Sequence, residues 1–352
     1  MIRPLIARRS PTRTAEPPHS VVFCSTAIAD WDWLPDSLLA QCRQWYFSAD
    51  PVHVPWYAQV PWLGLHRLRA SWRAIRCLHR HGGRLLITGD AQSTFWCALF
   101  AGFLRVRAYH VALSFRLPQA PRGFQGLFAQ WLYAGVDQVI VHSRAEQRLY
   151  SQELGIPQQR LTMTYWGSAP PLVQPATPLV SGEYVSIWVD GGVDYARLKR
   201  AIAALPMIPF VIVTGDRDRV PLPSLPNVQI YRATTLAQRM NVLHYARFVV
   251  HPLASAYQPC DYQMLVAAMH LGKALVLPEL PTLSDYAFHN ANAVLYPLGE
   301  AEALAIAIQT LWTDVVRCEI LGTNGRDFAR TFCSDATRLK NLQPLLLHAG
   351  RW

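Results

Sequence analysis

Short apolar runs alternate with segments of helical periodicity along most of this chain. In the first half, apolar residues recur at helical spacing from Leu65 to Leu78, and the Gly82-Gly83 pair ends this predicted helix. Strands are predicted at 21–27, 84–90, 108–115, 137–143 and 161–167, and further helices at 93–104, 125–135 and 144–155. This alternation predicts a parallel sheet with helices on both faces.

The same pattern begins again after residue 183. Strands are predicted at 184–192, 209–216, 227–233, 248–253 and 274–279, and helices at 195–205, at 235–246, and from Cys260–Gln263 to Gly272. The stretch before this second half, SAPPLVQPATPLVSGE, has four prolines in sixteen residues and is typical of a linker.

At 352 residues the chain exceeds the roughly 250 to 300 residues at which a single core stops growing. We therefore predict two α/β domains. The expected division is a mobile N-terminal tail (1–20), a first domain (21–170), a linker (171–183), a second domain (184–340) and a C-terminal tail (341–352).

Composition indicates a soluble protein with a large core, since 51% of residues are hydrophobic and 16% are charged. The longest apolar run, 95–104, is much shorter than the roughly 20 residues that a membrane-spanning helix needs, and the N-terminal segment lacks the apolar core of a signal peptide. The seven cysteines are scattered without a C-x-x-C pair, so we expect reduced thiols in the cytoplasm. No histidine spacing indicates a metal site, and none is predicted.

Positive charge is concentrated in the first half of the chain. Residues 1–150 hold 17 arginines against 8 acidic residues, whereas the rest is nearly neutral, and many of these arginines fall in 66–84. Such a surface attracts the phosphates of lipid head groups, nucleic acid or a sugar nucleotide. No interleaved aromatic and basic module or recognition helix is present, so we do not expect nucleic acid as a partner.

Loops that follow the predicted strands are the candidate binding sites. Open α/β sheets bind ligands beyond the carboxyl ends of their strands, and two such domains form a cleft. In the second half these loops hold Gly191 and Gly192, then Thr214, Gly215 and Asp216, then Tyr231. Backbone amides at a glycine pair can approach a phosphate, although a tight strand-to-helix turn explains the same residues.

The stretch QPCDYQMLVAAMHLGK offers a helix start whose free amides could hold a diphosphate. Its interior, which includes Met264 and Leu265, has the pattern of a buried helix face, and Lys273 is predicted as a helix-end cation. In the first half, Asp90 follows a predicted strand. It is either an acid, base or acceptor-binding group, or the N-cap of the next helix.

Several of these segments, in order, resemble the GT-B glycosyltransferases, and within them family 4. The similar segments are VIVHSRAEQRLYSQELGIPQQRLTMTYWG, VDGGVDYARLKRAI, ARFVVHPL, AAMHLGKALVLPELPTLSDYAFHNANAVLYPLGEAEALAIAIQTLW and LGTNGRDFARTFCS. The resemblance covers about residues 84–340. It implies two Rossmann-like doubly wound domains facing a central cleft, with a nucleoside diphosphate sugar held by residues 185–290 and an acceptor bound by the first domain.

The chain departs from that family at positions that matter for its chemistry. The family usually carries two glutamates eight positions apart, and here Pro259 and Ala267 stand in their places. Val193 stands where a basic residue often pairs with the diphosphate, with Arg197 and Lys199 close by. The histidine that commonly ends a strand of the acceptor domain falls near Leu113 and Ser114.

The resemblance and the loops together imply a site for a donor, with no cofactor besides the nucleotide-sugar as co-substrate. Asp90 and Asp261 are the candidates for chemistry. The expected donor-binding residues are Gly191, Gly192, Arg197, Lys199, Thr214, Gly215, Asp216, Tyr231, Cys260, Asp261, Tyr262, Gln263 and Met264.

Two functions remain in competition. One is a cytoplasmic hexosyltransferase-type enzyme that rests its Arg-rich domain on the anionic inner membrane face and modifies a lipid-linked, polysaccharide or other glycan acceptor. The other is a GT-B domain without catalysis that acts as a nucleotide-sugar-binding or partner subunit, which the missing glutamates favour.

Overall fold

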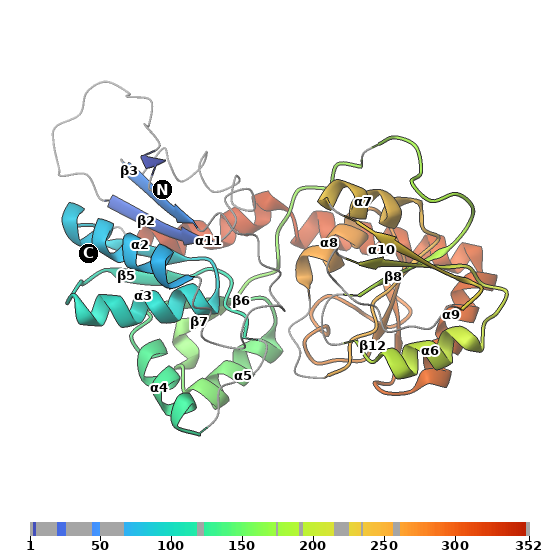
Figure 1. Cartoon of the computed structure of the whole chain (residues 1–352), viewed down its shortest axis with the longest axis horizontal. Coiled ribbons are helices and arrows are strands. Elements are labelled where there is room, and N and C mark those ends of the chain that lie inside the picture. The colour runs from blue at the N-terminus through green and yellow to red at the C-terminus, as the bar shows by residue number, and fades with distance from the viewer. Residues whose placement is uncertain are drawn as a thin grey trace. The chain divides into compact units, whose positions relative to one another are not determined.

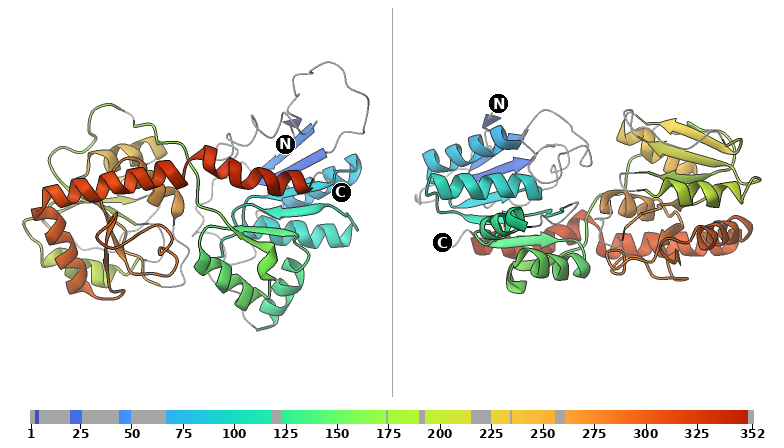
Figure 2. Two further views of the ribbon diagram at one scale, coloured as in Figure 1. Left: turned by 180° about the vertical axis from the view of Figure 1, so that it is seen from behind. Right: turned by 60° about the horizontal axis from the view of Figure 1, so that its bottom comes forward.

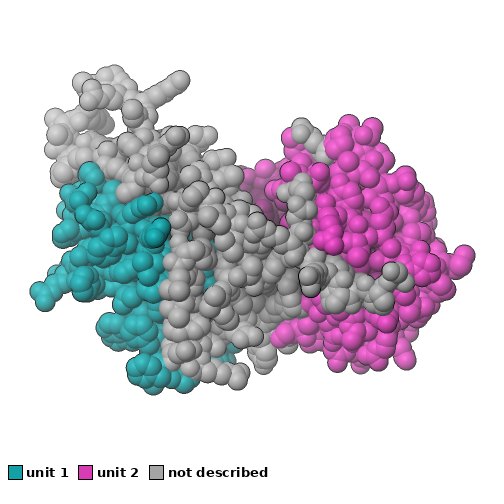
Figure 3. Space-filling view, in the orientation of Figure 1, with its two compact units in different colours: residues 1–164, 339–352 teal, residues 165–338 magenta. Residues whose placement is uncertain are grey.

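The computed structural model divides the chain into two compact units. Unit 1 comprises Met1–Thr164 and Leu339–Trp352, and unit 2 comprises Tyr165–Arg338 (Figure 3). The structure describes residues 3–4, 20–25, 44–49, 67–117, 123–173, 175–189, 193–214, 225–233, 235–255 and 261–349.

The sheet of unit 1 has seven strands in the order β1-β3-β2-β4-β5-β6-β7 (Figure 1). The strands are β1 (Arg3–Pro4), β2 (Ser20–Ser25), β3 (Gln44–Ala49), β4 (Leu85–Thr88), β5 (Tyr109–Ala112), β6 (Gln138–Val141) and β7 (Leu161–Met163). All pairs are parallel except β1 with β3. In unit 1, strand is therefore confirmed in every segment where the sequence predicted one. Strands β1 and β3 were not predicted, and β1 corrects the expectation of a mobile tail over 1–20, because Arg3 and Pro4 pair with β3.

One layer of helices covers this sheet. Its members are α2 (Leu68–His81), α3 (Ala91–Phe103), α4 (Gly123–Tyr133) and α5 (Arg144–Leu154), each packed on the next, and a short 3-10 turn, Gln158–Arg160, leads into β7. Strands β4 to β7 are successive neighbours, so right-handed crossovers put α3, α4 and α5 on one face. Helix α2 ends as predicted at Gly82, whose φ of 63° favours glycine.

Unit 2 has six parallel strands in the order β10-β9-β8-β11-β12-β13. The strands are β8 (Val185–Trp188), β9 (Phe210–Thr214), β10 (Val228–Arg232), β11 (Val249–Val250), β12 (Leu275–Pro278) and β13 (Ala293–Tyr296). The strand order reverses between β8 and β11, which is the arrangement of a doubly wound nucleotide-binding sheet.

Helices cover both faces of the second sheet and enclose two apolar cores. The helices are α6 (Tyr195–Ala203), α7 (Leu236–Tyr245), α8 (Tyr262–His270), α9 (Ala301–Thr313) and α10 (Val315–Phe332), and α11 (Asp335–Ala349) follows them in the chain. Side chains from α7 and α8 share one core, and side chains from α6 and α9 share the other. Because both faces are buried, most of these strands are continuous apolar runs.

Helices α8 and α10 approach closely. Gly272 ends α8 with a φ of 70°, and a Cβ at Gly322 of α10 would overlap the Gly272 carbonyl oxygen. The predicted helix-end cation Lys273 donates from Nζ to the carbonyl of Ala246, the C-cap of α7, at 2.8 Å. Burial lowers the pKa of Lys273. The lysine thus stabilises the end of α7 rather than that of its own helix.

The C-terminal segment differs from the sequence prediction. A tail was expected from residue 341, whereas Asp335–Ala349 forms the single helix α11, which begins in unit 2 and ends in unit 1 (Figure 2). The prolines of the predicted linker lie in unit 2, whose first residue is Tyr165. Asn241 holds part of that segment, because its Nδ2 donates to the carbonyl of Pro175 at 2.7 Å and its Oδ1 accepts from the Leu179 amide at 2.9 Å.

Candidate functional site

In unit 2, the reversal between β8 and β11 places two loops at the carboxyl edge of the sheet. Val193, in the loop after β8, and Leu253, in the loop after β11, form an antiparallel bridge. A pocket opens beside this bridge, lined from α6, from the loop after β11 and from the loop after β13. Its lining includes Asp194, Arg197, Leu253, Tyr296, Gly299 and Glu300. A sheet of this order binds ligands at this edge.

Arg197 is the cation of this pocket. Asp194 caps α6 by accepting from the Arg197 amide at 3.0 Å, and its carboxylate also pairs with the Arg197 guanidinium. The guanidinium stays 44% exposed, and a Cβ at Gly299 would lie 3.6 Å from its Cζ. A ligand phosphate would share this guanidinium with Asp194. Lys199, the other cation predicted on α6, is exposed and does not line the pocket.

Asp261 holds the start of α8 in place. Its carboxylate accepts from the Met264 amide at 3.4 Å, and the residue is half-buried. Gln263, one position into the helix, is also half-buried. Both side chains are therefore placed where a ligand at the helix start could meet them, but the Met264 amide already has an acceptor.

One predicted donor contact is corrected, because the Tyr262 side chain belongs to the core. Tyr262 is fully buried, donates from its hydroxyl to the Thr282 carbonyl at 3.1 Å, and stacks on Tyr286 with ring centroids 4.9 Å apart. The Met264 side chain is buried in the core between α8 and the sheet, as its place on the apolar helix face predicted, and its amide donates to Asp261.

The remaining predicted donor residues lie in or at the end of two strands or outside the described residues. Thr214 is buried at the end of β9, and Tyr231 is half-buried against the core beside α7 and α8. Gly191, Gly192, Gly215, Asp216 and Cys260 lie outside the described residues. Ala267, where the family has its second glutamate, is buried in the same core as Met264.

His251, which the sequence did not single out, stands just beyond β11. Its Nδ1 lies 3.2 Å from the Trp188 carbonyl, which can only accept, so in the neutral ring Nδ1 carries the proton and Nε2 is an acceptor. Burial lowers the pKa of His251, although the Asp261 carboxylate opposes that shift. Among the described residues, neither His251 Nε2 nor Trp188 Nε1 has a hydrogen-bond partner.

Both residues line one small cavity between α8 and the sheet. The other residues that line it are apolar and include Leu243, Met264 and Leu265. A buried acceptor and a buried donor are each costly when they have no hydrogen-bond partner. A hydroxyl group, which donates and accepts, matches both.

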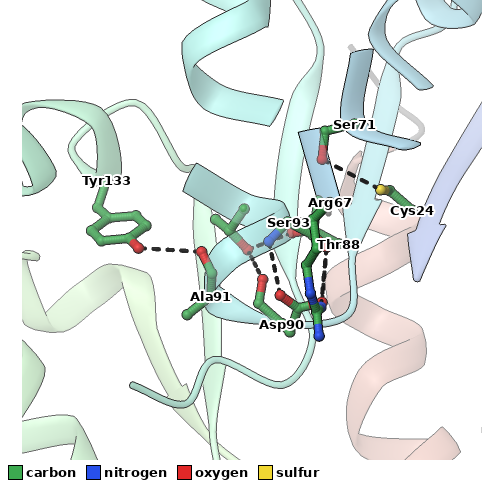
Figure 4. Close-up of polar contacts among 9 residues, drawn as sticks. Cys24, Arg67, Ser71, Thr88, Asp90, Ala91, Ser93 and Tyr133 are labelled. Atoms are coloured by element: carbon green, nitrogen blue, oxygen red, sulfur yellow. Dashed lines mark hydrogen bonds and ion pairs between the residues drawn. The ribbon is translucent and has the colours of Figure 1, made fainter. Parts of the chain in front are cut away.

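In unit 1, Asp90 lies just beyond the carboxyl end of β4 and caps α3 (Figure 4). Its carboxylate accepts from the Ser93 amide and from the Ser93 hydroxyl, each at 2.8 Å, and pairs with the guanidinium of Arg67. The Arg67 side chain is 6% exposed and that of Asp90 25%. Of the two roles considered for Asp90, the structure therefore shows the helix cap, reinforced by a largely buried ion pair.

A serine and a histidine meet at the ends of β5 and β6. Ser114 Oγ lies 3.3 Å from His142 Nε2, and His142 Nδ1 lies 3.1 Å from the Thr164 carbonyl. Both side chains are buried. The structure thus places a histidine from the neighbouring strand beside Ser114, a proximity that spacing along the chain could not reveal.

Other kinds of site are not found within the described ranges. No cluster of three metal-ligating side chains occurs there, and no described helix is both long and apolar enough to cross a membrane. The five cysteines described there, Cys24, Cys77, Cys97, Cys318 and Cys333, are free thiols, and Cys24 Sγ lies 3.7 Å from Ser71 Oγ (Figure 4).

Solved structures are similar to this chain over nearly its whole length. Sucrose-phosphate synthase from Thermosynechococcus elongatus superposes with a TM-score of 0.72 at 17% identity, covering 94% of this chain and 100% of that one. HepE from Anabaena in complex with UDP gives 0.69 at 17% identity over 94% and 100%. The lipopolysaccharide outer core galactosyltransferase WaaB gives 0.60 at 11% identity over 94% and 99%.

The chain has the GT-B fold. The doubly wound order of unit 2 and the largely parallel sheet of unit 1 agree with that assignment. No protein-family profile matches the chain, and no curated protein matches it in sequence. HepE has also been solved with UDP-glucose, at a TM-score of 0.69 and 18% identity over 94% of this chain and 99% of that one.

Proposed function

We propose that this GT-B chain is a glycosyltransferase of the family 4 type, which transfers a sugar, of the hexose class, from a nucleoside diphosphate donor bound by unit 2. The observation that carries the proposal is the pocket at the reversal between β8 and β11, with the Arg197 guanidinium at its wall. The complexes of HepE with UDP and UDP-glucose support a nucleotide-sugar as the ligand.

The chemistry proposed for this site is stabilisation of the leaving diphosphate. Sugar transfer from a diphosphate needs positive charge at the departing phosphate more than it needs a protein nucleophile. Arg197 would supply that charge, with Asp194 fixing its position from the cap of α6. The amides at the start of α8 would add to it, and Asp261 and Gln263 would contact sugar hydroxyls.

In this proposal, His251 and Trp188 take over part of the role of the two missing glutamates. With Pro259 and Ala267 in place of the two carboxylates, the chain needs other groups to hold donor hydroxyls. His251 Nε2 would accept from one hydroxyl and Trp188 Nε1 would donate to it, since both line the cavity against α8. The pair would restore an acceptor without restoring a negative charge.

The acceptor in this proposal is a glycan or lipid-linked molecule met by unit 1. The excess of arginine in the first half of the chain supports an anionic membrane surface as the place where such an acceptor is presented. The competing proposal is a GT-B protein that binds nucleotide-sugars without transferring them, and the absence of both family glutamates favours it.

Thermal unfolding with and without UDP, GDP and their sugars tests the donor site. A ligand at 100 times its Kd stabilises the folded state by about 2.7 kcal/mol, which appears as a raised Tm. Arg197→Ala is expected to weaken binding about tenfold or more, because it removes the cation from the pocket. Lys199→Ala is the matched control on the same helix and should bind as the native chain does.

The outcomes separate the two proposals. Hydrolysis of a bound nucleotide-sugar, at a rate that falls with Arg197→Ala and not with Lys199→Ala, supports the enzyme. Binding without hydrolysis, and without transfer to any of a panel of glycan and lipid-linked acceptors, supports the inactive binding protein. No Tm shift with any of the nucleotides would reject both.

A further inference from the structure

The solvent-facing side of α2 is a stripe of arginines. Arg69, Arg73, Arg76 and Arg80 are all exposed, and their spacing puts them within an arc of about 60° on the helix. The opposite side, with Ala70, Ala74, Ile75 and Leu78, is buried. No residue of α2 is acidic, and none of the four arginines pairs with a carboxylate in the part of the chain that the structure describes.

The solvent-facing side of α4 is apolar instead. Phe124, Leu127 and Trp131 are 84%, 66% and 68% exposed, and they too fall within about 60° of one another around the helix. The buried side carries Ala129, Leu132 and Tyr133, so the helix is apolar on both sides and has no charged residue. A helix of this kind is normally covered on both sides.

A fourth exposed apolar residue lies between these two helices in the chain. Phe103, the last residue of α3, is 76% exposed, and the exposed Arg105 and Arg107 follow it. Apolar side chains beside arginines suit a partner surface in which an apolar layer lies directly beneath an anionic one.

The three helices form one surface, because α2 packs on α3 and α3 packs on α4 (Figure 1). Aromatic contacts join them: Trp72 meets Phe100 at 5.1 Å, and Phe95 meets Phe128 at 5.9 Å. We name the exposed arginines and apolar residues of these helices, with Arg105 and Arg107, the α2–α4 face. Its residues are Arg69, Arg73, Arg76, Arg80, Phe103, Arg105, Arg107, Phe124, Leu127 and Trp131.

We propose that the α2–α4 face docks on an anionic lipid bilayer. Between residues 67 and 164 the chain has thirteen arginines against four carboxylates and no lysine, which complements anionic head groups. Phe124, Leu127 and Trp131 would enter the boundary between head groups and acyl chains, where tryptophan is favoured. A bilayer satisfies the arginines and the apolar side chains together, whereas a nucleic acid would leave Leu127 exposed to water.

The proposal uses no residue of the pocket in unit 2, so it stands or falls independently of the donor site. The test is sedimentation of the full chain with vesicles of phosphatidylcholine alone and of phosphatidylcholine mixed with phosphatidylglycerol. We expect binding to the anionic vesicles, reduced by salt because the arginines contribute through screened charge. Binding of equal strength to both vesicle types would overturn the proposal.

Two double variants separate the two contributions. Arg73→Glu with Arg76→Glu reverses charge on α2 and is expected to lower the vesicle partition coefficient at least about tenfold. Phe124→Ser with Trp131→Ser removes the apolar insertion and is expected to lower it about tenfold or more at every salt concentration. All four side chains are exposed, so the Tm should change little, which circular dichroism checks.

Matched controls come from unit 2. Arg330→Glu reverses an exposed charge, and Met207→Ser removes an apolar side chain that is 87% exposed. Both should bind vesicles as the native chain does. The proposal is overturned if the α2 and α4 variants behave like these controls. It is also overturned if a single-stranded oligonucleotide binds more tightly than the vesicles, or if the α4 variant converts a dimer to a monomer in size-exclusion chromatography.

Discussion

Buried ionisable side chains in unit 1 have structural roles that their positions in the sequence do not reveal. Asp90 ends up opposite Arg67, which lies 23 residues earlier in the chain, and together they hold the start of α3. His110 lies inside the sheet, with Nε2 3.1 Å from Thr88 Oγ1. A carboxylate and an imidazole are both common catalytic groups, so geometry rather than residue type has to decide their roles.

The role of Asp90 can be decided by comparing two substitutions. Asp90→Asn keeps an oxygen that can cap α3 but removes the negative charge that pairs with the largely buried Arg67 guanidinium. We expect the free energy of unfolding of Asp90→Asn to fall by about 2 kcal/mol, and that of Asp90→Ala to fall further. Urea denaturation measures both. If Asp90→Asn loses all sugar transfer while unfolding like the native chain, Asp90 is a catalytic residue instead of a structural one.

His110 makes stability depend on pH. Burial lowers the pKa of His110 to about 3, while the unfolded chain titrates near its usual 6.5. The neutral ring therefore stabilises the fold fully above pH 6.5, and this contribution is lost as the pH falls below that value. Between pH 7 and pH 5, the free energy of unfolding of the native chain should therefore fall by about 2 kcal/mol more than that of His110→Gln. Equal losses in both chains would contradict this account.

The cavity beside α8 gives a prediction about donor binding. His251→Phe removes an acceptor that has no partner among the described residues, but it also removes the Nδ1 donor to the Trp188 carbonyl, so the free energy of unfolding should fall by about 1 kcal/mol. Donor affinity should fall about tenfold if the ring accepts from a donor hydroxyl. Trp188→Phe removes the other member of the pair and should act similarly. Unchanged affinity in both variants would make this cavity a purely structural feature.

At the scale of elements, the contact between α8 and α10 depends on one glycine. A Cβ at Gly322 would overlap the Gly272 carbonyl oxygen and lie 3.0 Å from its carbon, and both are backbone atoms that cannot rotate away. Gly322→Ala is expected to lower the free energy of unfolding by about 1 to 3 kcal/mol. Gly325→Ala, in the same helix, would meet Met269 Cγ at 3.7 Å and should raise stability by about 0.5 to 1 kcal/mol.

Elements with continuous apolar runs could be predicted from the sequence, because burial on both faces leaves a clear pattern. Strands β8, β9 and β12 are buried throughout and fall inside the predicted segments. Strand β3 (QWYFSA) mixes polar and aromatic residues and gave no such signal. Helix α11 was missed because its proline, Pro344, and its short apolar stretches read as a tail.

The candidate site was harder to predict than the fold. Arg197 was singled out because it lies close to Val193, the position at which the resembling family often has a basic residue for the diphosphate, and the structure places Arg197 in the pocket. Tyr262 was misassigned, since residues at the start of a helix alternate between ligand and core and the sequence does not give the helix rotation. His251 was missed because its significance lies in what surrounds it, namely the Trp188 carbonyl and an apolar cavity.

At the scale of the whole molecule, charge and ligand chemistry are divided between the two units. Unit 1 holds the excess of arginine and the exposed aromatic side chains of α4, and unit 2 holds the pocket at the point where the strand order reverses. This division supports the proposal that unit 1 binds the acceptor and unit 2 binds the donor. It also means that substitutions on the α2–α4 face and in the pocket can be studied separately.

Unit 2 is an uninterrupted stretch of chain, whereas unit 1 is completed by the end of α11. During synthesis the ribosome delivers residues 339–349 only after all of unit 2, so unit 2 has its full sequence before unit 1 does. Unit 1, which begins first along the chain, is therefore the last to have its full sequence. Until residues 339–349 have been made, their contacts with the rest of unit 1 cannot form, and the nascent chain would need a chaperone most at that stage.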